Sequence, residues 1–259
     1  MMNILEEVRG CQTIGISGHI RPDGDCAGSC LGMALYLQKA MPGVRVDVFL
    51  ENFSDALTKN LAGAEEIRHD YVTDLDHYDA FLCLDCEKER LGDALDLFMK
   101  AEKKINIDHH RTNSSDTDYA YVDPDAAATG EIIYDIITAM GDEIDAHTGE
   151  ALYAALTTDT GNFQYSNCTK KTHEIAAALY DSGMNHSEVC IQIYENVSVG
   201  RIRLDNMIMN TLDIFADGKI FTGIAIRDIP QWKIREKRII FLLNKLSWHS
   251  MKNIMEITL

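Results

Sequence analysis

Short apolar runs alternate with helical patterns along the first half of the chain. The apolar runs, each of which predicts a buried strand, cover residues 13–17, 44–50, 81–85 and 104–108. Between them, the spacing of apolar positions predicts helices over roughly residues 26–40 and 91–101. Strands that alternate with helices in this way favour a parallel sheet with helices on both faces. The predicted fold class is therefore α/β.

The second half of the chain is mainly helical in pattern. Helices are predicted over residues 129–140, 146–156, 172–182 and roughly 191–212. Two short strands, 211–216 and 220–226, then flank Asp217-Gly218, a pair that supplies the positive φ angles of a tight hairpin turn. A domain boundary is predicted near residues 181–187, because Ser182-Gly183 stops one helix and Asn185 or Ser187 can cap the next.

Composition narrows the class of protein. The 259 residues are 46% hydrophobic and 25% charged, which is typical of a globular protein and excludes a disordered or fibrous one. No apolar run is long enough to span a membrane, and residues 1–7 lack the basic and then apolar plan of a signal peptide. The seven cysteines are scattered and odd in number. We therefore expect a reduced, cytoplasmic protein with no membrane association.

The charge is strongly negative and unevenly distributed. The formal net charge is −17. Residues 1–230 hold 18 basic and 39 acidic side chains, a net charge of −21, whereas residues 231–259 hold six basic and two acidic ones, a net charge of +4. Such acidity argues against a protein that holds nucleic acid by phosphate neutralisation alone. Divalent cations in an acidic pocket could nevertheless bring phosphates in.

Imidazole and carboxylate side chains cluster where predicted strands and one later helix end. In an open α/β sheet, ligands gather at the carboxyl ends of the strands. The residues at these ends are His19, Asp23, Asp25, Asp85, Asp108, His109, His110 and Asp159. Mixed sets of this kind suit Mn²⁺, Fe²⁺ or Mg²⁺ better than a structural zinc site. Divalent cations are also needed to hold so many carboxylates together, since like charges raise one another's pKa.

Each cluster alone has a simpler explanation. Asp23 or Asp25 could only cap the helix that follows, and residues 108–110 could form a solvated loop. Cys83 and Cys86 have Cys-x-x-Cys spacing but lack a second cysteine pair at zinc-site spacing, so we expect Cys83 to face the core. Four clusters in one chain, each at the end of an apolar segment, favour a shared site over four independent accidents.

Four stretches in this order resemble the motifs of the DHH phosphoesterase superfamily. They are HIRPDGDCAGS at 19–29, FLCLDCEKERLG at 81–92, INIDHHRTN at 105–113 and LTTDTGNFQYSN at 156–167. The resemblance runs from about residue 14 to 197 and includes VDPDAAATGEIIYDII at 122–137. Within the superfamily, the chain is most similar to the bacterial nanoRNase/pAp phosphatases, which trim very short RNAs and dephosphorylate 3′-phosphoadenosine 5′-phosphate (pAp).

This resemblance implies a two-metal site in a five-stranded parallel sheet flanked by helices. One ion would be held by His19, Asp23 and Asp85, and the second by Asp25, Asp85, His109 and Asp159, with Asp85 bridging. Mn²⁺ is the expected ion. His110 would face the substrate phosphate and Asp108 would orient an imidazole. Arg111 and Asn113, just past the histidine pair, are the candidates for contact with substrate phosphate or sugar.

The implied function is hydrolysis of short single-stranded RNA and pAp by metal-activated water. The DHH catalytic domain is predicted over residues 1–185, with a linker helix and an incomplete, smaller α/β C-terminal lobe over 186–259. Three possibilities stay open: this activity, another DHH-type hydrolysis of pyrophosphate or a cyclic-dinucleotide product, and a catalytically impaired metal-binding remnant. Homodimerisation is also left open.

The last 30 residues depart from the family pattern. Beyond the continuous match, the chain resembles the start of the family's second lobe over about residues 199–226 and then stops matching, and the Gly-Gly-His stretch of the nanoRNase-like proteins does not occur. Our hypothesis is that the tail from about residue 229 arises from a frameshift or an early stop in the coding sequence.

Overall fold

The computed structural model describes residues 2–53, 58–114, 116–209, 212–214 and 220–222. The chain divides into two compact units, Met1–Asn196 and Val197–Leu259, and each is described by itself. Within the described ranges, no helix is both long and apolar enough to cross a lipid bilayer.

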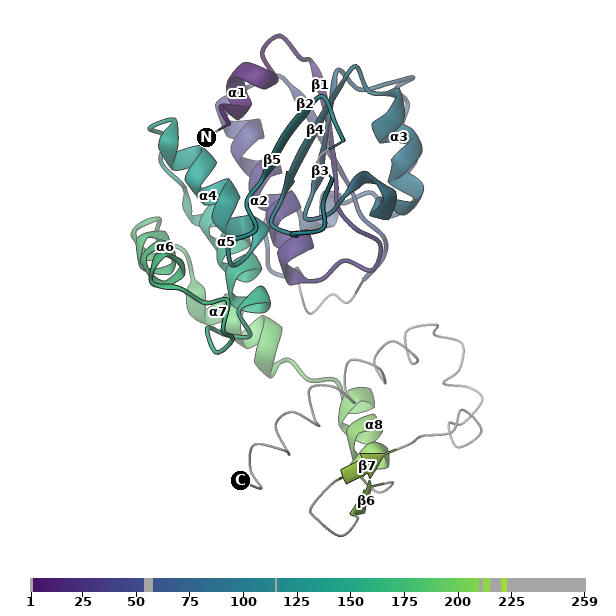
Figure 1. Cartoon of the computed structure of the whole chain (residues 1–259), viewed down its shortest axis with the longest axis vertical. Coiled ribbons are helices and arrows are strands. Elements are labelled where there is room, and N and C mark those ends of the chain that lie inside the picture. The colour runs from purple at the N-terminus through teal and green to yellow at the C-terminus, as the bar shows by residue number, and fades with distance from the viewer. Residues whose placement is uncertain (1, 54–57, 115, 210–211, 215–219, 223–259) are drawn as a thin grey trace. The chain divides into compact units, whose positions relative to one another are not determined.

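The first unit is built on a five-stranded parallel sheet, as predicted (Figure 1). Its strands are β1 (Thr13–Ser17), β2 (Arg45–Phe49), β3 (Ala80–Leu84), β4 (Lys103–Asp108) and β5 (Tyr119–Val122). They lie in the order β2-β1-β3-β4-β5, and every adjacent pair is parallel. The chain leaves β1 for one edge and returns on the other side of β1 as β3. This reversal makes the carboxyl ends of β1 and β3 the switch point at which α/β sheets bind ligands.

Helices cover both faces of this sheet. The first face carries α2 (Gly24–Ala40) and α4 (Thr129–Ala139), and α5 (Ala146–Asp159) packs on these two helices. The opposite face carries η4 (Gly92–Ala94) and α3 (Leu95–Lys100) (Figure 1). The alternation along β3 explains the two cores, since Leu82 and Leu84 join the α2 core whereas Phe81 and Cys83 join the α3 core. The predicted core position of Cys83 is confirmed.

The remaining elements complete the first unit. They are α1 (Ile4–Glu7), η2 (Ala64–Glu66), η3 (Lys88–Arg90), α6 (Lys170–Asp181), α7 (His186–Cys190) and the π-helix η5 (Ile191–Glu195). Gly183 follows α6 with a φ of 79°, and Asn185 caps α7 by accepting from the backbone N–H of Glu188. The helix stop and the cap predicted for this stretch are therefore confirmed.

Helices α2 and α5 cross at van der Waals distance of their backbones. A Cβ atom added to Gly28 would lie 2.4 Å from the carbonyl oxygen of Ala151, so only glycine fits there. One turn earlier, Gly24 lies against the side chain of Thr158, whose Cγ2 would be 2.3 Å from an added Cβ atom. The crossing therefore brings the last residue of α5, Asp159, to the first turn of α2.

Two predicted helices differ from the structure. The helix expected over 91–101 is instead the 3₁₀ turn η4 followed by α3. The single helix expected over roughly 191–212 is wrong: η5 ends at Glu195, Asn196 leaves the helical region with a ψ of 74°, and α8 (Val199–Met209) begins anew. The Ser198 side chain accepts from the backbone N–H of Arg201 and so caps this second start.

The second unit contains α8 and the predicted hairpin. Strands β6 (Leu212–Ile214) and β7 (Ile220–Thr222) pair in antiparallel fashion, which confirms the two strands. The Asp217-Gly218 turn and the basic tail, with the frameshift hypothesis attached to it, lie outside the described residues.

Candidate metal centre

The structure brings together all of the side chains proposed as metal ligands. His19 follows β1, Asp25 lies in the first turn of α2, Asp85 follows β3, and His109 follows β4. Asp159 ends α5 and reaches the same place through the α2–α5 crossing. The result is two neighbouring groups of imidazoles and carboxylates that share Asp85.

The first group surrounds His19. Its Nε2 atom lies 3.6 Å from Oδ1 of Asp23 and 3.4 Å from Oδ2 of Asp85. The His19 Nδ1 atom lies 2.9 Å from its neighbour's carbonyl oxygen, which orients the ring and turns Nε2 toward the carboxylates. Asp23 also caps α2, since its Oδ1 accepts from the backbone N–H of Cys26 at 3.3 Å. Capping and ligation are therefore compatible at this residue.

The second group surrounds His109. Its Nε2 atom lies 3.7 Å from Oδ2 of Asp25, 3.5 Å from Oδ1 of Asp85 and 3.4 Å from Oδ2 of Asp159. Ligands about 2.1 Å from one ion lie roughly 3.0–3.5 Å from each other, so spacings near these values fit a shared cation. The two oxygens of Asp85 thus face different imidazoles.

Asp85 occupies an unusual backbone conformation. Its φ is 61°, in the left-handed region that few residues other than glycine adopt. Its backbone N–H donates to the Ile107 carbonyl at 3.0 Å, and its Oδ1 accepts from the Thr129 hydroxyl at 3.0 Å. The turn therefore projects the carboxylate from the end of β3 between the two imidazoles.

The amino end of α4 holds Asp25. The carboxylate accepts from the backbone N–H groups of Thr129 at 2.7 Å and Gly130 at 3.0 Å, and from the Ser29 hydroxyl at 2.9 Å. These groups satisfy helix N–H donors and place a negative charge at the positive end of the helix dipole. Thr129 is not among the site residues predicted from the sequence. Its signal in the sequence is its position at the start of the helix predicted over 129–140, directly after three alanines.

A positive charge would stabilise the ionised forms of the buried carboxylates in this centre. Burial raises the pKa of Asp25, and burial together with the Asp25 charge raises the pKa of Asp85 well above its usual range. Burial lowers the pKa of His19, but the carboxylates of Asp23 and Asp85 outweigh burial and raise the His19 pKa to about 11. A divalent cation between these groups would stabilise the ionised carboxylates and displace the imidazole proton.

Asp108 and His110 form a pair beside the two groups. Oδ1 of the buried Asp108 lies 2.7 Å from Nδ1 of His110 and accepts the backbone N–H groups of His109 and His110. Burial raises the pKa of Asp108, but its hydrogen bonds from His110 and Asn113 outweigh burial and lower it. The Asp108 bond raises the pKa of His110. The half-exposed imidazole is thus fixed by one nitrogen, which leaves Nε2 for another partner.

The two candidates for substrate contact differ in direction. Arg111 is exposed, and its nearest carboxylate is that of Asp125 at 3.5 Å. Asn113 turns inward instead, because its amide donates to Oδ2 of Asp108 at 2.6 Å and to Oδ1 of Asn106 at 2.8 Å. Asn106 is also absent from the site residues predicted from the sequence. The sequence feature that could have identified it is a polar amide between two isoleucines in a predicted buried strand.

The donor set suits a divalent cation. The grouped atoms are imidazole nitrogens and carboxylate oxygens, with the Cys26 thiol beside His19 and Asp85. Burial raises the pKa of Cys26 well above its usual range, so this thiol stays protonated and is a poor ligand. Nitrogen and oxygen donors without thiolate fit Mn²⁺, Fe²⁺ or Mg²⁺.

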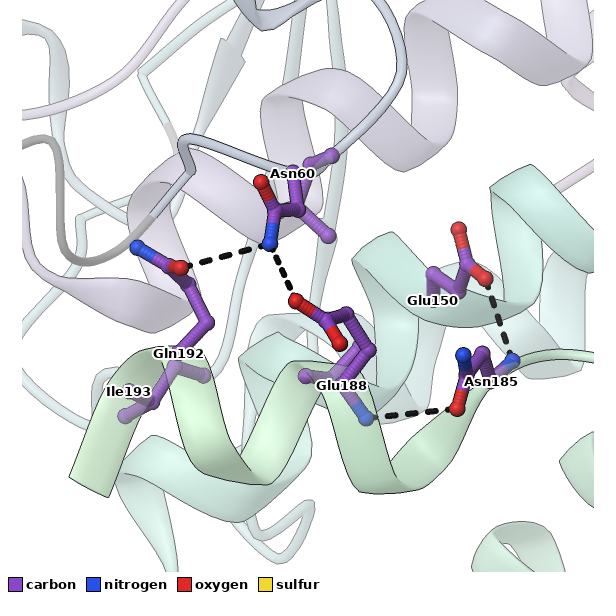
Figure 2. A pocket seen from close by; sticks show the side chains of 8 residues that line it. Asn60, Glu150, Asn185, Glu188, Gln192 and Ile193 are labelled. Atoms are coloured by element: carbon purple, nitrogen blue, oxygen red, sulfur yellow. Dashed lines mark hydrogen bonds between the residues drawn. The ribbon is translucent and has the colours of Figure 1, made fainter. Parts of the chain in front are cut away.

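A small cavity lies away from this centre. It lies between the loop that carries Asn60 and the α7–η5 segment (Figure 2). The volume of this cavity is about 90 Å³. The Asn60 amide donates to Glu188 at 2.5 Å and to Gln192 at 3.3 Å across it (Figure 2). None of the proposed metal ligands lines this cavity, and the Asn60 hydrogen bonds across it connect α7 and η5 to the loop that carries Asn60.

Comparisons with known proteins agree with this geometry. The DHH family, N-terminal domain, matches residues 13–180. The chain is 26% identical over 212 residues to the bifunctional oligoribonuclease and PAP phosphatase NrnA of Bacillus subtilis (strain 168), which covers 80% of this chain and 64% of that protein. It is 32% identical over 188 residues to the protein of the same name from Thermus thermophilus, which covers 72% of this chain and 54% of that protein.

A solved structure agrees with the fold. An exopolyphosphatase-related protein from Bacteroides fragilis superposes with a TM-score of 0.74 at 26% identity, over 82% of this chain and 65% of that one. The chain thus spans between about half and two thirds of the length of these relatives. Since the family match covers well over half of the chain and contains every grouped imidazole and carboxylate, the chain belongs to the DHH family.

Proposed function

We propose that this protein is a metal-dependent phosphoesterase that hydrolyses short oligoribonucleotides and pAp, with two divalent ions, preferably Mn²⁺. The observation that carries the proposal is the position of Asp85, whose two oxygens face the His19 group and the His109 group separately. A carboxylate placed in this way can bridge two ions. The names of the Bacillus and Thermus relatives support the choice of substrates.

Each proposed ligand has a distinct task. His19, Asp23 and Asp85 would hold one ion, and Asp25, Asp85, His109 and Asp159 would hold the other. A pair of such ions supplies Lewis acidity toward phosphate oxygens and an activated water. The backbone N–H groups at the amino end of α4 fix Asp25 and oppose the rise in its pKa that burial causes, and a bound cation would favour its ionised form further.

His110 and Arg111 are the proposed contacts to substrate. The Asp108 hydrogen bond raises the pKa of His110 and thus favours its charged form, which can donate from Nε2 to a phosphate oxygen. The exposed Arg111 guanidinium can contact a second phosphate or the sugar. Both lie just beyond β4 in the predicted catalytic domain, residues 1–185.

One assay tests the proposal directly. The purified chain is incubated with pAp, a diribonucleotide or pyrophosphate, with Mn²⁺ or with a chelator, and released phosphate and mononucleotide are measured. We expect Mn²⁺-dependent release of phosphate from pAp and of mononucleotide from the diribonucleotide, both abolished by Asp85→Asn. An Asp96→Asn variant, changed at an exposed position on α3, serves as the matched control. Hydrolysis of pyrophosphate alone would redirect the proposal to a different substrate class.

A further inference from the structure

Asn106 is a buried amide in the middle of β4. It is 1% exposed, and the adjacent Ile105 and Ile107 point to the opposite face, into the α2 core. Its partner in the β3–β4 register is Cys83, which lies in the α3 core. A polar side chain in such a place is costly unless all of its hydrogen-bonding groups are satisfied.

The side-chain amide of Asn106 donates its hydrogen bonds to the turn that contains Asp85. Its Nδ2 donates to the carbonyl of Cys83 at 2.9 Å and to the carbonyl of Cys86 at 2.8 Å. These two carbonyls stand on either side of Asp85, whose left-handed φ makes the chain reverse between them. The amide therefore bridges the two ends of the turn that aims the shared carboxylate.

The oxygen of the same amide accepts a hydrogen bond from the segment that follows β4. Oδ1 of Asn106 accepts from Nδ2 of Asn113 at 2.8 Å, and Nδ2 of Asn113 also donates to Oδ2 of Asp108 at 2.6 Å. Asp108 in turn holds His110 by the 2.7 Å hydrogen bond. One chain of hydrogen bonds thus runs from the Asp85 turn to the Asp108–His110 pair.

We propose that Asn106 is a positioning residue that holds Asp85 in its left-handed conformation and, through Asn113, fixes the distance between Asp85 and His110. Residues in sparsely populated backbone regions persist only where their surroundings determine them, and Asn106 supplies that determination here. The proposal rests on the proposed function in assigning the metal-binding role to Asp85. It gives Asn113 a structural task within the site in place of substrate contact.

The test separates positioning from simple loss of a buried hydrogen bond. Asn106→Ala removes the amide, and Asn106→Asp keeps its shape but faces both carbonyls with an acceptor. Tyr78→Phe is the control, because it removes a buried hydrogen bond, from the Tyr78 hydroxyl to Oδ2 of Asp47 at 2.5 Å, near the amino end of β3. Mn²⁺ affinity is measured by calorimetry, and hydrogen–deuterium exchange of residues 84–87 is measured in the metal-free protein.

We expect both Asn106 variants to bind Mn²⁺ about 10- to 100-fold more weakly than the unsubstituted protein, the usual effect of losing a group that orients a ligand. Exchange over residues 84–87 should accelerate in both variants. The Tyr78→Phe protein should lose thermal stability while keeping its Mn²⁺ affinity and its exchange rate over this segment. Unchanged affinity and exchange in Asn106→Ala would overturn the proposal.

The two proposals fail in different ways. If the unsubstituted protein hydrolyses none of the three substrates while the Asn106 variants show faster exchange, the positioning role stands and the proposed function falls. If the protein is active and the Asn106 variants match it in affinity and exchange, the positioning role falls alone. Should Mn²⁺ not bind at all, the exchange rates alone decide the role of Asn106.

Discussion

At the scale of single residues, His109 and His110 make different contacts in the centre. The two rings are adjacent in sequence, with centroids 4.6 Å apart. Nε2 of His109 faces three carboxylates, whereas Nδ1 of His110 is held by Asp108. We therefore expect substitutions of the two histidines to affect different measurements.

Replacing His110 should slow the reaction without releasing the metal. His110→Gln removes a charged donor toward the substrate, and loss of such a donor costs about 10²- to 10³-fold in kcat. Mn²⁺ affinity should stay within a few-fold of the unsubstituted value. Calorimetry and steady-state kinetics with pAp measure the two quantities. His109→Gln is the matched comparison, and equal loss of metal affinity in both variants would contradict the assignment.

Asp79 offers a prediction about acid stability, away from the metal centre. Its carboxylate accepts the backbone N–H groups of Gln12 at 2.6 Å and Thr13 at 2.9 Å, and the Gln12 bond is the main cause of its lowered pKa. Because the folded pKa lies below the unfolded value, this stabilisation is present above about pH 4 and is lost as the pH falls through the folded value.

The Asp79→Asn variant should therefore unfold more easily than the unsubstituted protein at pH 7, by about 1 kcal/mol. The difference should shrink steadily below pH 4, as the carboxylate of the unsubstituted protein becomes protonated. Urea unfolding at a series of pH values gives both quantities. A difference that stayed constant down to the acid limit would argue that the charge of Asp79 has no part in the effect.

A residue of the site could be predicted where its position follows from the sequence pattern around it, and not where it follows from contacts with residues distant in sequence. Asp85 and His109 stand at the ends of apolar runs, so their positions follow from the sheet alone. Thr129 and Asn106 act on residues that are distant in sequence: Thr129 lies 104 residues from Asp25, which its N–H contacts. No periodicity encodes such a pairing, and it becomes visible only once α4 and α2 are packed.

At the scale of elements, the strands and helices that the sequence predicts correctly are those with a clear pattern of hydrophobic residues. The three central strands, β1, β3 and β4, bury residues on both faces, and the apolar residues in each predict the strand within a residue or two. Strand β5 was not predicted, because it is four residues long, lies at the sheet edge and has no buried residue. The helix predicted over 191–212 failed because the break at Asn196 interrupts a pattern that periodicity alone continues.

The α2–α5 crossing gives a prediction at this scale. Gly28→Ala would place a Cβ atom 2.4 Å from a backbone oxygen of α5, which cannot move without shifting the helix. We expect a loss of about 1–3 kcal/mol in the free energy of unfolding, the usual cost of overpacking. Gly32→Ala is the comparison, since its Cβ would meet a flexible leucine side chain at 2.8 Å. Urea unfolding should show a smaller loss for Gly32→Ala.

At the scale of the whole molecule, acidity and metal binding are linked. The chain carries a formal charge of −17, and part of that charge is gathered at the carboxyl ends of the strands. Without cations these buried carboxylates repel one another, which opposes folding. With cations the same groups can attract phosphates, so the acidity of the chain is compatible with the proposed action on oligoribonucleotides.

Mn²⁺ should therefore stabilise the folded protein. At a free concentration 100 times the dissociation constant, one bound ion contributes about 2.7 kcal/mol. For a chain of this size, that corresponds to a rise of roughly 5–10 °C in Tm. Thermal unfolding in Mn²⁺ and in a chelator measures the shift. An Asp85→Asn protein should shift far less, and an equal shift in both proteins would mean that the ion binds elsewhere.

The spread of the proposed ligands along the chain has a consequence for biosynthesis. His19 and Asp159 are separated by most of the first unit, and the latter joins the others only through the α2–α5 crossing. During translation, the early part of the sheet can form before α5 has been made. If these residues bind metal as proposed, we expect a nascent chain up to β4 to hold only part of the ligand set and to bind ions more weakly and less selectively. The full set, and with it selection of the ion, would then be in place only after Asp159 has been synthesised and α5 has packed on α2.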